Sequence, residues 1–463
     1  MKRILKIIGL LLVIGLAYGI FTNYPKLNFI TGFASKSVCS CTFIADRTLA
    51  TVEAQDNDFS PINLATNTID FENKSVTSTV FGLKARTAVY KEGLGCILIP
   101  EDSDHSALIV KPNRNTTPKN MPFPYGELPQ KDTVFSNIDY TVLNEAVANA
   151  FDVEDEKLKR TRAVLVVYKD QIIAEKYAED FNKDTKILGW SMTKSITNAI
   201  VGILEKQGRV NKNQSHLFTE WENDERANIT LNNLLQMNSG LAWEENYEII
   251  SDVTKMLFLK EDMPKIPREK QLESTPNTSW NYSSGTTNLI SGFIRNQFKT
   301  EQEYLDFWYA ELIDKIGMHS MTIETDLKGH FVASSYGWAT ARDWSKFGLL
   351  YLHNGNWNGE KILTEDWVDY TKTPTNTSGK NEMVYKDGEP VYSSDGVYGA
   401  QFWLNAGGRY PDVPKDLFSC NGYQGQQVSI IPSKDVVIVR FGLVEDPKFS
   451  YNTFLSEILA AIN

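Results

Sequence analysis

The sequence predicts an α+β fold in which an antiparallel sheet is flanked by helices and interrupted by a large helical insertion. Residues 161–180 hold two β-type runs around a Lys-Asp turn, and residues 425–443 hold two more around "PSKD". Apolar residues at helical spacing cover four further segments: 140–151, 229–241, 341–363 and 450–463. Strands near both ends of this region, with helices between them, favour a sheet that the terminal segments close.

Length and charge limit the classes of function. A chain of 463 residues is long enough for one large domain and a smaller one, since single cores stop growing near about 250 to 300 residues. The formal net charge of -11 repels phosphate backbones, and no run of Lys and Arg reverses it locally. We therefore expect no nucleic-acid partner. The sequence gives no indication of the oligomeric state.

Residues 1–25 have the layout of a signal peptide or a signal-anchor. Lys2, Arg3 and Lys6 precede an apolar stretch over residues 7–21, and no small-residue cleavage site directly follows it. This favours an uncleaved anchor over residues 4–21, with the amino end in the cytoplasm. We expect an exported protein on the periplasmic or extracellular side, attached to the membrane through this segment only.

Three further parts follow the anchor. Residues 39–111 contain short β-type runs and no convincing amphipathic helix, which predicts a small β-rich module. Residues 112–138 are rich in proline and polar residues and predict an extended linker that wraps the surface. Residues 139–463 form the main domain.

The cysteines bear on the same module. In an exported chain Cys96 could pair with Cys39 or with Cys41 and so staple the small module. A metal site at Cys39 and Cys41 is disfavoured, because one residue separates the thiols and no histidine is near. The five histidines have no paired ligand spacing, and nucleotide-binding motifs are missing. We expect no metal and no cofactor.

The segment 189–208, "GWSMTKSITNAIVGILEKQG", places Ser191 and Lys194 three residues apart at the head of an apolar helix. A serine hydroxyl needs a neighbouring base to become a nucleophile. Because side chains at i and i+3 share one face of a helix, the Lys194 amine can reach Ser191. The alternative is that Ser191 caps the helix and Lys194 is solvated. A helix that is apolar on nearly every side would instead bury Lys194, at a cost that favours a functional role.

A second segment, 274–292, "STPNTSWNYSSGTTNLISG", supplies Tyr282. A phenol beside a lysine ammonium is stabilised as phenolate, so we expect Tyr282 to act as a base and later as an acid. The alternative is a tyrosine packed under a loop.

Together these motifs resemble the serine β-lactamase and penicillin-binding-protein family, specifically its branch of class C-like esterases and 6-aminohexanoate-dimer hydrolases. "SMTKS" resembles the nucleophile motif and "YSS" the second motif of that branch. The segments "ITLNNLLQMNSGLAWEENY", "GWATARDWSKFGLLYLHNGNWNGEKIL" and "YGAQFWLN" also look like this family. The resemblance covers residues 140–460 and implies a β-lactamase-like fold.

The resemblance implies a reaction with named roles. Ser191 would attack a carbonyl, Lys194 and Tyr282 would share the proton transfers, and water would hydrolyse the acyl-enzyme. Ser284, or the backbone next to it, would help to position the substrate.

The resemblance also implies an oxyanion hole. It would use the backbone N–H of Ser191 and a second N–H from a strand near Cys420, Asn421 and Gly422. The Lys-Thr-Gly of true β-lactamases is absent from that strand, and the four residues before Gly422 are uncharged. This departure favours a neutral amide or ester over an acidic lactam or peptide end.

Aromatic residues in or beside these segments could wall an apolar acyl pocket: Trp190, Trp243, Trp280, Trp338 and Tyr398. Three functions stay open on the sequence. The first is an exported serine hydrolase that cleaves a small-molecule amide or ester. The second is a β-lactamase or DD-peptidase acting on the cell wall, and the third is a non-catalytic binding module on the same fold.

Overall fold

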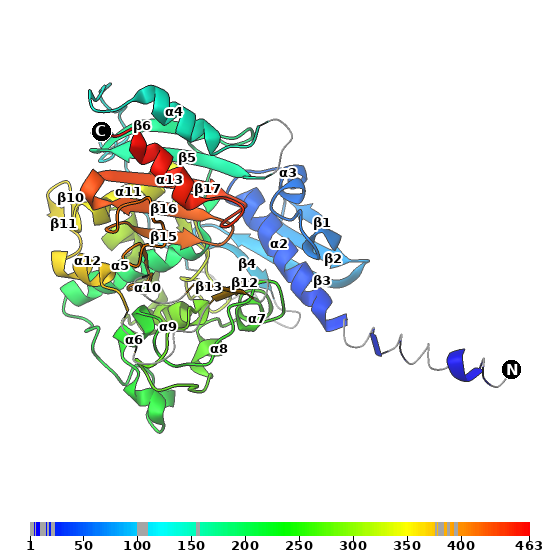
Figure 1. Ribbon diagram of the computed structural model, residues 1–463. Coiled ribbons are helices and arrows are strands. Elements are labelled where there is room, and N and C mark those ends of the chain that lie inside the picture. The colour runs from blue at the N-terminus through cyan, green and yellow to red at the C-terminus, as the bar shows by residue number, and fades with distance from the viewer. Residues whose placement is uncertain are drawn as a thin grey trace.

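The computed structural model describes residues 4, 6–9, 15, 18–19, 24–99, 110–153, 158–375, 377, 384–386, 389–392 and 397–463. A large domain is built around a six-stranded sheet, and a small module of one long helix packed on four strands lies beside it (Figure 1).

The six-stranded sheet joins the two ends of the large domain and is antiparallel throughout. Its strands, in spatial order, are β14 (Trp403–Leu404), β15 (Phe418–Gly422), β16 (Gln426–Ile431), β17 (Val436–Gly442), β5 (Thr161–Tyr168) and β6 (Gln171–Tyr177). The central contact pairs Val437 of β17 with Val167 of β5. This arrangement confirms the predicted sheet closed by terminal segments.

Helices cover both faces of this sheet, which explains why every residue of β5 and β17 is buried. Helices α4 (Tyr140–Asn149) and α13 (Tyr451–Ala460) pack on Val164 and Val166 of β5. The alternate residues, Leu165 and Val167, belong to the core on the opposite face. That core includes α5 (Thr193–Lys206) and α11 (Ala341–Leu352), which lie behind the sheet in Figure 1.

The remaining described elements of the large domain are mostly helical. They are α6 (Leu231–Leu235), α7 (Asp252–Leu259), α8 (Lys265–Arg268), α9 (Ser284–Arg295), α10 (Glu301–Trp308), α12 (Glu365–Lys372) and a small sheet of β7 (Ile187–Leu188), β9 (Gly337–Ala339) and β8 (Thr322–Ile323). Two short hairpins join β10 (Asn356–Trp357) to β11 (Glu360–Lys361) and β12 (Val384–Lys386) to β13 (Glu389–Tyr392). The prediction of a helix that runs to Gly240 was wrong in length. Helix α6 ends at Leu235, and the chain turns at Met237, which has a φ of 57°.

The small module differs from its prediction. It begins with two helices, α2 (Leu27–Phe43) and α3 (Leu49–Ala54), followed by β1 (Ala65–Asp70), β2 (Ser75–Val80), β3 (Leu83–Lys91) and β4 (Gly95–Ile99). The expectation of no helix from Cys39 onward was therefore wrong. The sequence of α2, "LNFITGFASKSVCSCTF", intersperses Gly, Ala, Ser, Thr and Cys among its larger apolar residues and is buried on most sides. It consequently lacks the apolar stripe that marks a surface helix.

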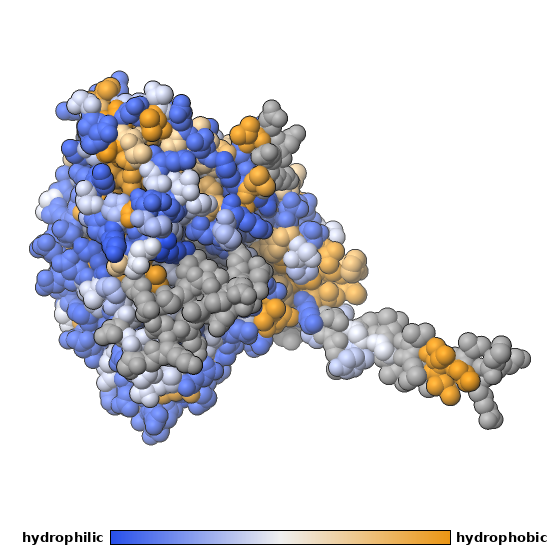
Figure 2. Space-filling view, viewed as in Figure 1, coloured by the Kyte–Doolittle hydropathy of each residue, from blue (hydrophilic) through white to orange (hydrophobic). Residues whose placement is uncertain are grey.

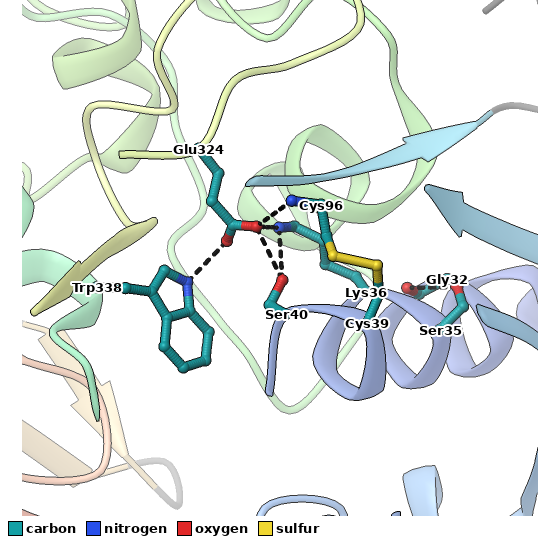
Figure 3. Close-up of a disulfide and its surroundings, with 8 residues drawn as sticks. All are labelled: Gly32, Ser35, Lys36, Cys39, Ser40, Cys96, Glu324 and Trp338. Carbon is teal, nitrogen blue, oxygen red and sulfur yellow. Dashed lines mark hydrogen bonds and ion pairs between the residues drawn. A yellow bond between two sulfur atoms is a disulfide. The ribbon is translucent and has the colours of Figure 1, made fainter. Parts of the chain in front are cut away.

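A buried ion pair fixes α2 against the large domain (Figure 3). Lys36 Nζ lies 2.5 Å from Glu324 Oε1. The same carboxylate accepts hydrogen bonds from Ser40 Oγ at 2.8 Å, from the Cys96 backbone N–H at 2.7 Å and from Trp338 Nε1 at 2.8 Å. Each buried charge is thus paired, as burial requires.

The disulfide joins Cys39 of α2 to Cys96 of β4 (Figure 3). This confirms one of the two pairings that the sequence left open. Cys41 and Cys420 are free and buried.

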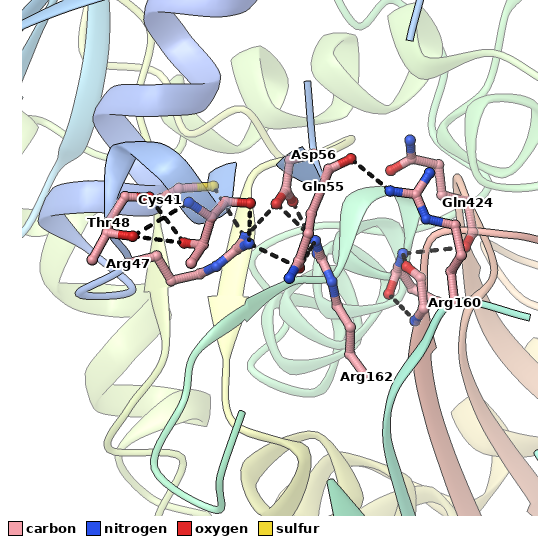
Figure 4. Close-up of polar contacts among 11 residues, drawn as sticks. Cys41, Arg47, Thr48, Gln55, Asp56, Arg160, Arg162 and Gln424 are labelled. Atoms are coloured by element: carbon pink, nitrogen blue, oxygen red, sulfur yellow. Dashed lines mark hydrogen bonds and ion pairs between the residues drawn. The ribbon is translucent and has the colours of Figure 1, made fainter. Parts of the chain in front are cut away.

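A second polar cluster ties the module to the sheet (Figure 4). Asp56 accepts hydrogen bonds from Arg47 of the module and from Arg162 of β5, the latter with Nη2 at 2.7 Å from Oδ2. Burial raises the pKa of Asp56, but the guanidinium groups of Arg162 and Arg47 outweigh it and hold the pKa below its usual value. The carboxylate therefore stays charged inside the contact between module and sheet.

Residues 112–138, the expected linker, contact the large domain. In residues 112–138, Arg114 Nη2 contacts Asp314 Oδ1 at 2.7 Å. This segment, described throughout, forms no helix or strand, only isolated bridges between Pro122 and Leu128 and between Ile138 and Ile462. The expected anchor over residues 4–21 falls mostly outside the described residues. Among the residues that the structure does describe, no helix combines the length and apolarity that crossing a membrane demands.

Candidate active site

Ser191 lies in a single 3₁₀ turn, Trp190–Met192, directly before α5. The preceding residue, Trp190, has a φ of 47°, a left-handed conformation that is strained for a bulky side chain. The Gly189 N–H donates to the Gly337 carbonyl at 2.8 Å and anchors the turn to β9. Ser191 is therefore held in a backbone geometry that packing imposes.

The Lys194 amine contacts Ser191, as the spacing predicts. Its Nζ lies 2.9 Å from Ser191 Oγ, 2.9 Å from Ser284 Oγ and 3.0 Å from the Ser334 carbonyl oxygen. A neutral amine has two N–H donors and one lone pair. If Ser284 and Ser334 take the two donors, the lone pair is left for the hydroxyl proton of Ser191.

Burial sets the ionisation of this amine. Lys194 is 1% exposed, and desolvation lowers its pKa to about 8, while the negative charge of Glu245 acts in the opposite direction. The amine is thus neutral in part of the molecules near neutral pH, which a general base requires.

Tyr282 lies next to Lys194 and belongs to the loop before α9. Lys194 Nζ lies 4.9 Å from the centroid of the phenol ring. Burial and, second, Glu245 raise the pKa of Tyr282, against the opposing hydrogen bonds with Ser191 and Trp403. Burial and Glu245 thus oppose the phenolate expected from the sequence and favour a neutral phenol beside Ser191.

Glu245 is the residue of this site that the sequence analysis missed. Its Oε1 accepts from Ser284 Oγ at 2.5 Å, and its Oε2 accepts from the Ser284 N–H at 2.9 Å and from Trp243 Nε1 at 2.5 Å. Glu245 stands among several acidic residues in "AWEENYE", and no spacing rule distinguishes it from Glu244 beside it.

Ser284 links Glu245 to Lys194. The residue is completely buried, and its hydroxyl receives from Lys194 and donates to Glu245. Its geometry makes it an internal bridge between Lys194 and Glu245; the expected help of Ser284, or of the backbone next to it, in positioning the substrate stays a prediction.

Strand β15 passes directly beside the serine turn. A Cβ on Gly422 would lie 2.1 Å from the Gly189 carbonyl oxygen, so only glycine allows this approach. Beyond Ser419, β15 has no pairing with β14, which leaves that edge of the strand open beside Ser191. The implied oxyanion-hole strand therefore lies next to the serine.

The side chains of this strand differ in character. Burial raises the pKa of the Cys420 thiol to about 12, so that it is an unreactive core group. The Asn421 Oδ1 is buried and has no hydrogen-bond partner in the described part of the chain. Its capacity to accept a hydrogen bond is therefore unused.

The predicted aromatic wall is divided among three places. Trp190 packs against Tyr423 with ring centroids 5.6 Å apart, and Tyr423 stacks on Tyr247 at 4.9 Å. Trp280 and Tyr398 surround Tyr282. Trp243 belongs to the same apolar cluster as Trp190 and donates to Glu245 of the site. Trp338 lies in another cluster and donates to Glu324.

One group of described residues could hold a cation: Asp262, Asp326 and His330. The Asp326 oxygens already accept from the backbone N–H groups of Met263, Lys328 and His330. The cluster thus organises a loop, and none of the hydrogen bonds described for Ser191 or Lys194 involves it.

The β-lactamase family model matches residues 129–446 of this chain. The chain therefore belongs to the β-lactamase family, and it is a serine hydrolase of the amidase and esterase type on that fold. The fold and the resemblance predicted from the sequence are both confirmed.

Among known proteins the chain is similar to the 6-aminohexanoate-dimer hydrolase of Paenarthrobacter ureafaciens, with 23% identity over 65% of this chain and 78% of that protein. A Bacillus anthracis structure provisionally named a 6-aminohexanoate-dimer hydrolase matches with a TM-score of 0.55 and 22% identity, covering 69% of this chain and 81% of that one. A family VIII carboxylesterase matches with a TM-score of 0.50 and 14% identity, covering 70% and 96%. At these low sequence identities, the similarity to the two structures shows that the chain shares their fold.

Proposed function

We propose that this protein is an exported, membrane-anchored hydrolase that cleaves a neutral amide or ester through an acyl-enzyme on Ser191. The observation that carries the proposal is the buried Lys194 amine at 2.9 Å from Ser191 Oγ, with its other donors directed at Ser284 and Ser334.

In the acylation step, neutral Lys194 takes the proton of Ser191 as Oγ bonds to the substrate carbonyl carbon. The backbone N–H of Ser191 and one from β15 near Asn421 stabilise the oxyanion. Tyr282, a neutral phenol, donates its proton to the leaving nitrogen or oxygen, and the proton held by Lys194 then restores the phenol.

Deacylation reverses these transfers. A water molecule loses its proton to Lys194 while attacking the acyl carbon, and Ser191 Oγ leaves with a proton. Glu245 takes no part in bond making in this scheme. Through Ser284 it holds the amine in place, and its charge keeps the pKa of Lys194 from falling further.

The charge of the site supports a neutral substrate. Lys194 and Glu245 are the charged groups joined to Ser191 by the described hydrogen bonds, and Lys194 is committed to proton transfer. A substrate carboxylate would be repelled by the negative charge of Glu245, and β15 carries no cation that could bind it. A short neutral amide or ester would pack against the aromatic wall of Trp190, Tyr247 and Tyr423.

Two features support the location outside the cytoplasm. A disulfide between Cys39 and Cys96 suits an oxidising compartment. The cations before the apolar stretch of residues 7–21 orient the anchor with the large domain outside.

Hydrolysis of neutral substrates tests the proposal. We expect wild-type protein to turn over neutral short-chain p-nitrophenyl esters and anilides, and the variant Ser191→Ala to lose at least about 10³-fold in kcat. Equal turnover by Ser191→Ala would assign the activity to another group.

A cell-wall β-lactamase is the second candidate, favoured by the family itself. Nitrocefin distinguishes the two: hydrolysis at a rate comparable to the neutral esters would favour the lactamase, and a rate far below it favours the amidase or esterase. A chain that forms no adduct with any active-serine reagent would instead be a binding module.

A further inference from the structure

The β2–β3 hairpin ends in an unusual turn. Val80 pairs with Leu83, and the two residues between them, Phe81 and Gly82, have φ angles of 53° and 72°. Both values are positive, as in the type I′ turn, whose first position favours Asn, Asp or Gly. A bulky residue there is strained. The turn also leaves Phe81 78% exposed, so that neither the backbone nor the core accounts for a phenylalanine at this position.

Other large apolar side chains surround this turn. Leu64 directly precedes Ala65, which pairs with Val80, so Leu64 lies at the same end of the sheet. Leu64 is 47% exposed and Leu83 is 45% exposed. We call Leu64, Phe81 and Leu83 the apolar tip; the apolar surface at the end of β2 and β3 is visible in Figure 2.

The rest of this sheet is not apolar on its outer side. The open face of β1 and β2 carries polar side chains: Thr66, Thr68 and Asp70 of β1 and Ser75, Thr77 and Thr79 of β2. The opposite face is covered by α2. Three large apolar side chains, Leu64, Phe81 and Leu83, are thus exposed together at one end of the module and form a patch, whereas Phe71 is exposed singly at the other end.

The chain enters the module at this same end. Tyr24, in the short turn before α2, lies under Lys84 of β3, with Nζ 4.9 Å from the ring centroid. The other end of α2 is marked by Phe43, which contacts Phe71 in the β1–β2 turn at 6.1 Å between ring centroids. Helix α2 therefore runs from the end of the module that holds the apolar tip to the end that holds Phe71. In the sequence, the apolar stretch of residues 7–21 lies just before Tyr24.

We propose that the apolar tip inserts into the surface of the lipid bilayer beside the anchor. An apolar turn next to a chain that leaves a membrane is within a few residues of the interface, where aromatic and apolar side chains are favoured. Tyr24 marks the interfacial level, and the long side chains of Lys26 and Lys84 can extend to the phosphates of the lipid headgroups. The contact fixes the orientation of the large domain relative to the membrane. This inference rests on the proposed anchor at residues 4–21.

Fluorescence quenching in proteoliposomes tests the inference on the full chain. Every native cysteine is either buried or in the disulfide, so a new surface thiol can be labelled selectively. We choose Phe81→Cys at the tip and, as the matched control, Phe71→Cys at the far end of the same sheet, where Phe71 is 70% exposed. A six-residue strand, β1, separates the two ends, which is about 20 Å.

Each variant is labelled with an environment-sensitive fluorophore and reconstituted in vesicles containing doxyl-labelled lipid. Vesicle flotation measures attachment, and fluorophosphonate labelling of Ser191 reports folding. We expect both variants to float and the label at residue 81 to be quenched at least several-fold more than the label at residue 71.

Three results would each overturn the inference. If both variants float and neither label is quenched, the anchor holds and the tip does not touch lipid. If neither variant floats, the anchor and the tip contact both fail. A label at residue 81 shielded from aqueous iodide without lipid quenching would assign the tip to a protein partner, which also contradicts the inference.

Discussion

At the scale of single residues, reactivity depends on whether Lys194 is neutral. The ordinary lysine pKa is lowered by burial to about 8. Because the base is the unprotonated amine, acylation should rise with pH and level off above about pH 8. The pH dependence of kcat/KM for a neutral ester measures this rising part of the profile, which we call the limb. The variant Lys194→Met should show no such rise and should be about 10²- to 10⁴-fold slower. A profile that is flat from pH 6 to 10 would rule out Lys194 as the base.

Glu245 provides a second prediction at this scale. Its charge raises the pKa of Lys194, so Glu245→Gln should lower that pKa and move the limb of kcat/KM to lower pH. Glu244→Gln is the matched control, since Glu244 is the exposed neighbour and makes no described contact with Ser284 or Lys194. A loss of activity with an unmoved limb would limit Glu245 to a structural role.

At the scale of elements, a buried ion pair stabilises the packing of α2 against the large domain. Lys36 and Glu324 have side-chain exposures of 6% and 1%. Glu324→Gln leaves a buried ammonium without its partner and should lower the free energy of unfolding by about 3–5 kcal/mol. The double variant Lys36→Met/Glu324→Gln should cost less than the sum of the two single variants.

Denaturant unfolding of the single and double variants measures this coupling. Asp184→Asn is the control, because it removes an exposed pair with Lys183 and should change stability by under about 1 kcal/mol. Additive losses in the double variant would show that the two charges do not stabilise each other.

The elements also show how far the sequence could predict the structure. Period-2 and period-3.6 patterns were sufficient for β5, β16, β17 and α11, because these elements bury long apolar side chains. The half-buried β6 was found from its position after the Lys-Asp turn. Helix α2 was missed, since small residues such as Ser35 and Ser40 are buried in it and no polar face alternates with an apolar one. In the site, the i, i+3 rule placed Ser191 and Lys194, whereas Glu245 depends on a loop contact with Ser284 that no local pattern encodes.

At the scale of the whole molecule, charge governs substrate choice. The net charge is -11, and Glu245 adds a carboxylate next to the site. We expect kcat/KM for a neutral acyl ester to exceed that for its succinyl analogue by about tenfold, because like charges near a protein surface repel by about 1–2 kcal/mol. The ratio should fall in high salt. A preference for the anionic ester would contradict a site built for neutral substrates.

The most direct test of the central proposal is the intact mass of the protein after reaction with a fluorophosphonate. The wild-type chain should gain one adduct, located on Ser191, and the Ser191→Ala chain should gain none. Lys194→Met should react at least about 10²-fold more slowly while staying folded. An unmodified wild-type chain, or equal labelling of Ser191→Ala, would contradict a serine activated by a buried amine.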